Sequence, residues 1–146
     1  MSVKFLSQFV EVARRISGAE RAFAITPDGQ VCAYSQMDDS PFSQAPFRDF
    51  ALETLRSAYQ KNQPIFTNNL IQDMAQAPTT NTNLGEMRFV VALPIQEVGA
   101  IYLDQPIRNG VIARDKVERL HAFALRALAG ELADLAADDL ERAFNA

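Results

Sequence analysis

A tightly connected pair of apolar segments constrains the fold of this chain most. Residues 88–95 and 98–104 are separated by only Gln96 and Glu97. Two strands joined so closely must form an antiparallel hairpin, because a parallel pair needs a crossover of about a dozen residues or more. The first segment is apolar at odd and even positions alike, which is typical of a strand that is covered on both faces. Its odd positions are Phe89, Val91 and Leu93, and its even positions include Val90 and Ala92.

The N-terminal half of the chain predicts two helices, two paired strands and a third short strand. Apolar residues recur at intervals of three and four over residues 3–17, as in an amphipathic helix. Residues 21–25 and 30–35 flank the sequence Thr26-Pro27-Asp28-Gly29, which is typical of a tight turn between paired strands. A second helix is expected over 47–62 and a strand over 65–67, because Pro64 disfavours helical geometry at the residue before it.

Two segments without hydrophobic periodicity are predicted to be loops. Residues 36–46 contain aspartate, serine and proline, and residues 68–86 are rich in asparagine and threonine. The second segment has room for a turn or two of helix around 70–75 but for no long element. Loops of this length in compact domains are usually functional or mobile.

The C-terminal helix is expected to run from 114 to 144 without a break, over roughly 45 Å at 1.5 Å per residue. A domain of this size has a radius of gyration of roughly 15 Å, so the last turns should project beyond the core. Four leucines repeat at the spacing of a coiled-coil seam: Leu125, Leu128, Leu132 and Leu135. We therefore expect a single domain over 1–146, with a core at 3–135 and a helical extension at 136–146.

Residues 87–120, MRFVVALPIQEVGAIYLDQPIRNGVIARDKVERL, resemble the end of a GAF domain, a family of small-molecule sensory domains. In that family an arginine- or serine-led strand, a Gly-aliphatic-aliphatic strand and a final helix follow one another. Residues 18–23 and 61–66 also match, but the hairpin connection is shorter than is common in the family. The resemblance implies an α+β fold: a GAF-like (profilin-like) antiparallel sheet of five to six strands with helices on both faces. The long N- and C-terminal helices would lie on one side.

A second resemblance keeps an alternative open. Residues 16–35, ISGAERAFAITPDGQVCAYS, resemble the opening of a roadblock-type dimerisation domain, in which a helix precedes an Asp-Gly hairpin. Roadblock domains are shorter and lack a long loop such as 68–86. A PAS-like relative is a further alternative, and all three families are antiparallel sheets flanked by helices.

The residues of the chain argue against an enzyme and against a resident cofactor or metal. Cys32 is followed by Ala33 rather than by the histidine that often follows a pigment-binding cysteine in GAF-like families. One thiol cannot run a two-cysteine reductase cycle. His121 is the only histidine, and no cysteine or second histidine completes a metal site around it. No glycine-rich phosphate-binding loop is present.

The GAF resemblance implies a small-ligand site between one face of the sheet, the second helix and the long loops. Aromatic walls with a few polar groups are typical of such sites, although they are also typical of a filled core. Phe50 and Phe89 are expected to face each other across the helix–sheet layer. The residues that match the ligand site are Tyr34, Phe47, Phe50, Asn69, Met74 and Phe89.

Charge and composition limit the partners of the chain. A net charge of −4 disfavours nucleic acid, and no apolar run approaches the length of a membrane span. The single cysteine suits a reducing, cytoplasmic compartment. A homodimer is expected through the first and last helices, with Phe5, Phe9, Leu125, Leu128, Leu132 and Leu135 at its interface.

Two functional classes follow from these observations. In the first, the chain is a non-catalytic sensory or regulatory domain of a signalling system that binds a small ligand or acts by dimerisation. In the second, it is a ligand-free, roadblock-like dimerisation or docking module for a protein partner. In either class the signal would pass to a separate output protein, or the chain would be one piece of a larger protein.

Overall fold

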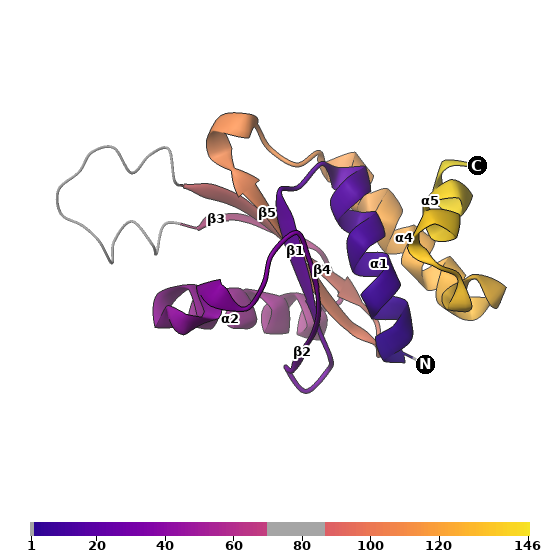
Figure 1. The fold of residues 1–146 in the computed structure, drawn as a ribbon, viewed down its shortest axis with the longest axis horizontal. Coiled ribbons are helices and arrows are strands. Elements are labelled where there is room, and N and C mark those ends of the chain that lie inside the picture. Colours follow the sequence, from indigo (N-terminus) through magenta and orange to yellow (C-terminus); the bar gives the residue numbers. More distant parts are fainter. Residues whose placement is uncertain (1, 70–86) are drawn as a thin grey trace, which may run out of the picture.

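A five-stranded antiparallel sheet forms the centre of the protein in the computed structural model, which describes residues 2–69 and 87–146 (Figure 1). The strand order is β2-β1-β5-β4-β3. The predicted hairpin is confirmed as β4 and β5, and the predicted pairing of the first two strands is confirmed as well. The strands are β1 (Arg21–Ile25), β2 (Val31–Ser35), β3 (Ile65–Asn69), β4 (Arg88–Ile95) and β5 (Gly99–Pro106).

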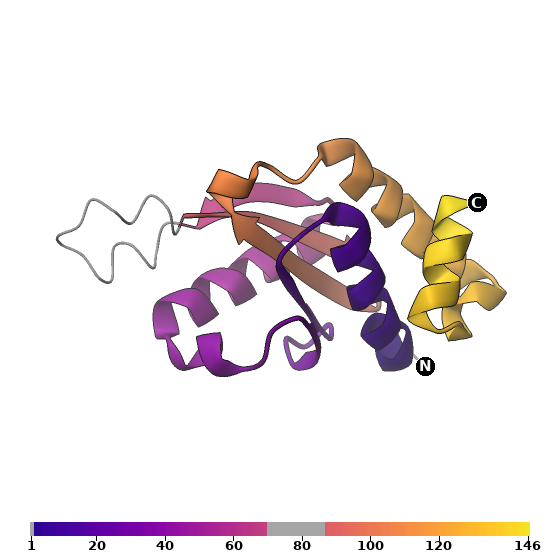
Figure 2. The ribbon, with the colours of Figure 1, turned by 45° about the horizontal axis from the view of Figure 1, so that its top comes forward.

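Helices cover both faces of the sheet. Helix α2 lies on one face, and α1 and α4 lie on the other, with α5 packed against α1 (Figures 1 and 2). The predicted α+β fold class is therefore confirmed. No helix in the described part of the chain is long and apolar enough to cross a membrane. The helices are α1 (Ser2–Ser17), α2 (Ala45–Lys61), α4 (Arg114–Ala129) and α5 (Ala137–Asn145), with short 3-10 helices η1 (Ser40–Ser43), η3 (Ile107–Asn109) and η4 (Glu131–Asp134).

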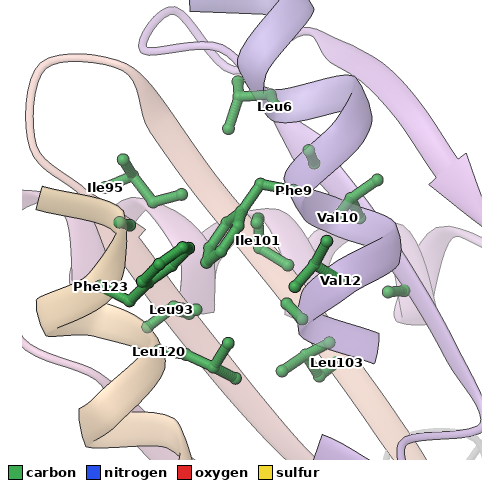
Figure 3. Packing of buried hydrophobic residues seen from close by; sticks show 14 of the residues in the cluster. Leu6, Phe9, Val10, Val12, Leu93, Ile95, Ile101, Leu103, Leu120 and Phe123 are labelled. Atoms are coloured by element: carbon green, nitrogen blue, oxygen red, sulfur yellow. The ribbon is translucent and has the colours of Figure 1, made fainter. Parts of the chain in front are cut away.

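Two apolar layers lie on the two sides of the sheet, because neighbouring residues of a strand point to opposite faces. On β4, Val91 and Leu93 pack toward α1 and α4, whereas Val90 and Ala92 pack toward α2. In the first layer the ring of Phe9 on α1 stacks on that of Phe123 on α4, with 6.2 Å between ring centroids (Figure 3). The prediction that this strand is covered on both faces is confirmed.

The prediction of one continuous C-terminal helix is wrong. Helix α4 ends at Ala129, and Gly130 adopts an extended backbone with φ −132° and ψ −152°. Glycine destabilises a helix interior by about 1 kcal/mol relative to alanine, so a helix through Gly130 would be least stable at this residue. Helix α5 then packs on α1, where the backbone N–H of Ala137 donates to Oε1 of Gln8 at 2.8 Å.

The end of the chain belongs to the core and does not project from it. Leu140 on α5 is fully buried, and the ring of Phe144 meets that of Phe123 edge-on at 5.5 Å. An apolar helix face gains more from burial against α1 and α4 than from extending into water. Residues 136–146 therefore complete the same apolar layer as the first helix.

Candidate functional site

The predicted ligand-binding residues are divided between the two faces of the sheet. Phe47 and Phe50 pack in the layer between α2 and the sheet. Phe89 packs in the opposite layer, where its ring lies 6.5 Å from that of Phe66. The expectation that Phe50 and Phe89 face each other is therefore wrong. Strand alternation is the reason, because α2 covers the face of Val90 and not that of Phe89.

The remaining predicted residues have different outcomes. Tyr34 is 39% exposed, on edge strand β2. The backbone of Asn69 pairs with Arg88 at the end of β3. Met74 lies outside the described residues.

Phe42, in the segment 36–46 that was predicted to be a loop, joins Tyr34 and Phe47 into one group of aromatic side chains. The ring of Phe42 in η1 lies 6.3 Å from Tyr34 and 5.5 Å from Phe47. It also meets Phe23 of β1 edge-on at 4.9 Å. Phe47 is fully buried, so it forms part of the core behind any ligand surface.

Beside these aromatic residues lies Asp104, which is the one buried charged residue in the described part of the chain. Asp104 on β5 is fully buried, and its Oδ1 accepts a hydrogen bond from Nε of Arg21 at 2.8 Å. Nε of Arg88 lies 3.1 Å from the same oxygen. Oδ2 accepts from the hydroxyl of Tyr102 at 2.6 Å. We call Arg21, Arg88, Tyr102 and Asp104 the Asp104 cluster.

The register of the sheet brings the Asp104 cluster together. Arg21 is the first residue of β1 and pairs directly with Asp104, while Val90 of β4 pairs with Asp104 from the other side. Arg88 and Tyr102 lie two residues along their strands from Val90 and Asp104, and so share the same face. Three adjacent strands thus contribute to one polar group in the α2 layer.

The charges of the Asp104 cluster support one another. Burial would lower the pKa of Arg21, but the neighbouring charge of Asp104 and their hydrogen bond outweigh it, and the pKa of Arg21 is raised. Burial, and then the charge of Asp104, raise the pKa of Tyr102 well above its ordinary value, so its hydroxyl stays a donor. The guanidinium of Arg21 also lies over the ring of Phe47, 5.2 Å from its centroid. Arg88 makes a further ion pair with Glu20.

An open hollow of about 720 Å³ adjoins the Asp104 cluster at Arg21. Both hydrogen bonds between Arg21 and Asp104 use Nε, and the Arg21 side chain is 17% exposed. On the rim, Asp38 accepts hydrogen bonds from the backbone N–H and the hydroxyl of Ser40, and these bonds lower its pKa. We call this the Arg21 hollow, and it is lined by Glu20, Arg21, Gln36, Met37, Asp38, Ser40 and Pro41.

Sequence reasoning missed the Asp104 cluster, although the chain carries a signal for it. The predicted strand ended at Asp104, whereas β5 continues to Pro106, which places the carboxylate inside the strand. A charged residue within an apolar strand, with an arginine opening each of two neighbouring strands, predicts a buried ion pair.

The reactive side chains considered in the sequence are single and isolated. Cys32 is half-buried against the α1 layer, and burial raises the pKa of its thiol. Burial lowers the pKa of His121 on α4. Within residues 2–69 and 87–146, no group of three or more histidine, cysteine, aspartate or glutamate residues is placed to hold a metal ion.

The residues predicted for a dimer interface are also divided. Phe5 and Phe9 are fully buried in the single chain, so their placement on an interface is wrong. They stack on each other at 5.1 Å and fill the layer between α1 and the sheet. Leu125 is 38% exposed, while Leu128, Leu132 and Leu135 are partly buried against the chain's own core.

Comparison with known proteins finds similarity at the level of the fold. No protein-family model matches the sequence, and no curated protein matches it either. Among solved structures, MglB of Myxococcus xanthus, a roadblock protein, is similar over 98% of this chain and 90% of its own length, with 9% identity and a TM-score of 0.46.

Two GAF-domain structures are also similar to this chain. The GAF domain/HD domain protein from Geobacter sulfurreducens has 14% identity and a TM-score of 0.47, over 96% of this chain and 98% of that one. The PixJ GAF domain of Thermosynechococcus elongatus, in its blue-light absorbing form, has 17% identity and a TM-score of 0.43, over 97% and 86%. With identities of 9%, 14% and 17% and TM-scores below 0.5, these similarities concern the overall fold alone.

Proposed function

We propose that this chain is a non-catalytic sensory or regulatory domain that binds a small polar ligand in the Arg21 hollow. The observation that supports this proposal is the position of Arg21, which forms part of the wall of the hollow and is anchored on the fully buried Asp104. The buried carboxylate already holds the guanidinium in one orientation, so little conformational entropy of Arg21 is lost when a ligand binds. Its terminal nitrogens are then donors for an oxygen of the ligand.

The charges around the hollow favour an uncharged or cationic ligand over an anion. The positive charges of Arg21 and Arg88 are matched by Asp104 and Glu20. Asp38 then remains on the rim as an additional negative charge. A ligand with an acceptor for Arg21 and a donor for Asp38 complements both groups.

The Asp104 cluster offers a physical route from the hollow to the rest of the fold. A ligand that contacts Arg21 changes the surroundings of a carboxylate shared by β1, β4 and β5. On the other face of β5, Leu103 packs in the layer of α1 and α4. The proposed output is a shift of these helices that a separate protein partner recognises. We propose that this occurs in a reducing, cytoplasmic compartment.

A thermal-shift screen with matched variants tests the proposal. Arg21→Gln and Arg88→Gln each remove one arginine from Asp104, but only Arg21 lines the hollow. A ligand at about 100 times its Kd stabilises the protein by about 2.7 kcal/mol, which raises Tm by roughly 5–10 °C. We expect this shift in the wild type and in Arg88→Gln but not in Arg21→Gln. An equal shift in both variants would place the ligand elsewhere.

A ligand-free homodimerisation or docking module is the second candidate function. It is favoured by Leu125, which is exposed on α4, and by its partly exposed neighbours Leu128, Leu132 and Leu135. Two-fold dimers are the commonest oligomers, and such a contact would use the same leucines on both copies. Light scattering on Leu125→Glu/Leu128→Glu protein tests this candidate. A dimeric wild type and a folded monomeric variant support it, whereas a monomeric wild type at high micromolar concentration refutes it.

A further inference from the structure

A second cavity lies at the other end of helix α2, separate from the Arg21 hollow. Its volume is about 240 Å³. The C-terminal half of α2, the end of β1 with its turn, and the start of β5 form its walls. Its lining residues are Ile25, Thr26, Pro27, Asp28, Gly29, Leu52, Arg56, Tyr59, Gln60 and Gly99.

The backbone around this cavity is fixed by the turn and by one glycine. The turn is closed by hydrogen bonds from Thr26 N to Gln30 O and from Gly29 N to Thr26 O, each 2.9 Å long. The β1–β2 register shifts at Ile25, which leaves an irregular strand end beside the cavity. Gly99 has a φ of +149°, and a Cβ there would lie 2.0 Å from the carbonyl oxygen of Ile25. The close approach of β1 and β5 therefore requires glycine at this position.

The cavity combines an apolar floor with a rim that carries one charge of each sign. Ile25 is buried, and Leu52 packs beside it in the α2 layer. The lining residues include a single cation, Arg56, and a single anion, Asp28. A singly charged ligand would meet one attractive and one repulsive group on this rim, whereas a zwitterion can pair with both.

The side chains of the rim are available to a ligand. Arg56 is 56% exposed, and its Nη1 pairs only with the exposed Glu53, at 3.1 Å, among the described residues. Such surface pairs contribute little stability, so exchanging Glu53 for a ligand carboxylate costs little. Asp28 is exposed, and its carboxylate accepts a hydrogen bond from the hydroxyl of Thr26.

We propose that this cavity binds a small zwitterion, namely an α-amino acid with an apolar side chain. The carboxylate would pair with Arg56, the ammonium group with Asp28, and the side chain would lie on Ile25, Leu52 and Tyr59. Burial of an apolar side chain supplies the favourable free energy, and the two charged contacts select the head group. This site is distinct from the Arg21 hollow and does not depend on a ligand there.

Isothermal titration calorimetry with L-leucine and L-phenylalanine tests this proposal on the wild-type protein. The analogues 4-methylpentanoate and 3-methylbutylamine each keep the leucine side chain but lack one of the two charges. At least one amino acid should bind. If leucine is the ligand, both analogues should bind about two- to fivefold more weakly than leucine, because each loses an ion pair with an exposed group. The absence of binding by either amino acid at concentrations up to about 10 mM would overturn the proposal.

Matched variants on one helix locate the binding. Arg56→Gln and Asp28→Asn should each weaken binding by about two- to fivefold, because both charged groups are exposed. Arg48→Gln is the control, because Arg48 is also an exposed arginine of α2 paired with a surface carboxylate but does not line the cavity. Binding that is unchanged in Arg56→Gln, or that is lost instead in Arg21→Gln, would overturn the proposal.

Discussion

Removal of the buried carboxylate by Asp104→Ala should be among the most damaging single changes in this protein. The substitution leaves Arg21 and Arg88 without their shared partner, and the hydroxyl of Tyr102 without its acceptor. Breaking a buried ion pair costs about 3–5 kcal/mol, because the remaining charge stays buried and uncompensated. The arginine side chains keep 17% and 14% of their exposure, so we expect a value of about 3 kcal/mol. For a domain of this size the loss corresponds to a fall in Tm of roughly 10 °C.

Urea unfolding of Asp104→Ala beside Asp139→Ala measures this cost against a matched control. Asp139 pairs with Arg142 on the surface of α5, so its removal should cost less than about 1 kcal/mol. The triple change Asp104→Leu/Arg21→Met/Arg88→Met should regain part of the stability, because it leaves no buried charge, although the hydroxyl of Tyr102 still lacks its acceptor. The reasoning is refuted if Asp104→Ala is as stable as the control, or if the triple variant is less stable than the single one.

Three further predictions follow from the packing and the titration behaviour. Gly99→Ala should destabilise the protein by about 1–3 kcal/mol, because its Cβ would meet the carbonyl oxygen of Ile25. Gly130→Ala is the control, because it makes no such contact and should change the denaturant midpoint little. Equal midpoints for the two variants would contradict the close approach of β1 and β5. Leu140→Ala should cost about 2–5 kcal/mol in urea unfolding, since the side chain is fully buried, and a loss below about 0.5 kcal/mol would mean that α5 lies outside the core. Burial holds the pKa of His121 below 6.5, so the unfolded state takes up a proton first and stability falls as the pH drops below about 6.5. Thermal melts of His121→Gln between about pH 7 and 5 should therefore fall less steeply than those of the wild type, and parallel curves would contradict this origin.

Most of the sheet could be predicted from the sequence because its signals are local. The short connection at Gln96-Glu97 determines an antiparallel pair, and the turn sequence 26–29 determines another. The alternation along β4 was visible too, and it already placed Phe89 and Val90 on opposite faces. The error over Phe50 and Phe89 arose because the sequence does not say which face α2 covers.

The parts that sequence reasoning missed depend on contacts between distant segments. The apolar repeat over residues 114–144 favoured one helix, and Gly130 marked only a local weak point in it. The packing of α5 on α1, which buries Leu140, could not be predicted from that repeat. Phe5 and Phe9 looked available to a partner because the sequence does not reveal how much surface α4 and α5 cover. The Asp104 cluster required the register of three strands, which no single strand encodes.

Native mass spectrometry of the purified protein tests the central claim, ligand binding in the Arg21 hollow, most directly. The account predicts that the wild type and Arg88→Gln carry a small molecule that is released on denaturation, and that Arg21→Gln does not carry it. The same spectra report the oligomeric state. A wild type that carries no small molecule after purification, and acquires none from a metabolite extract, would contradict the account.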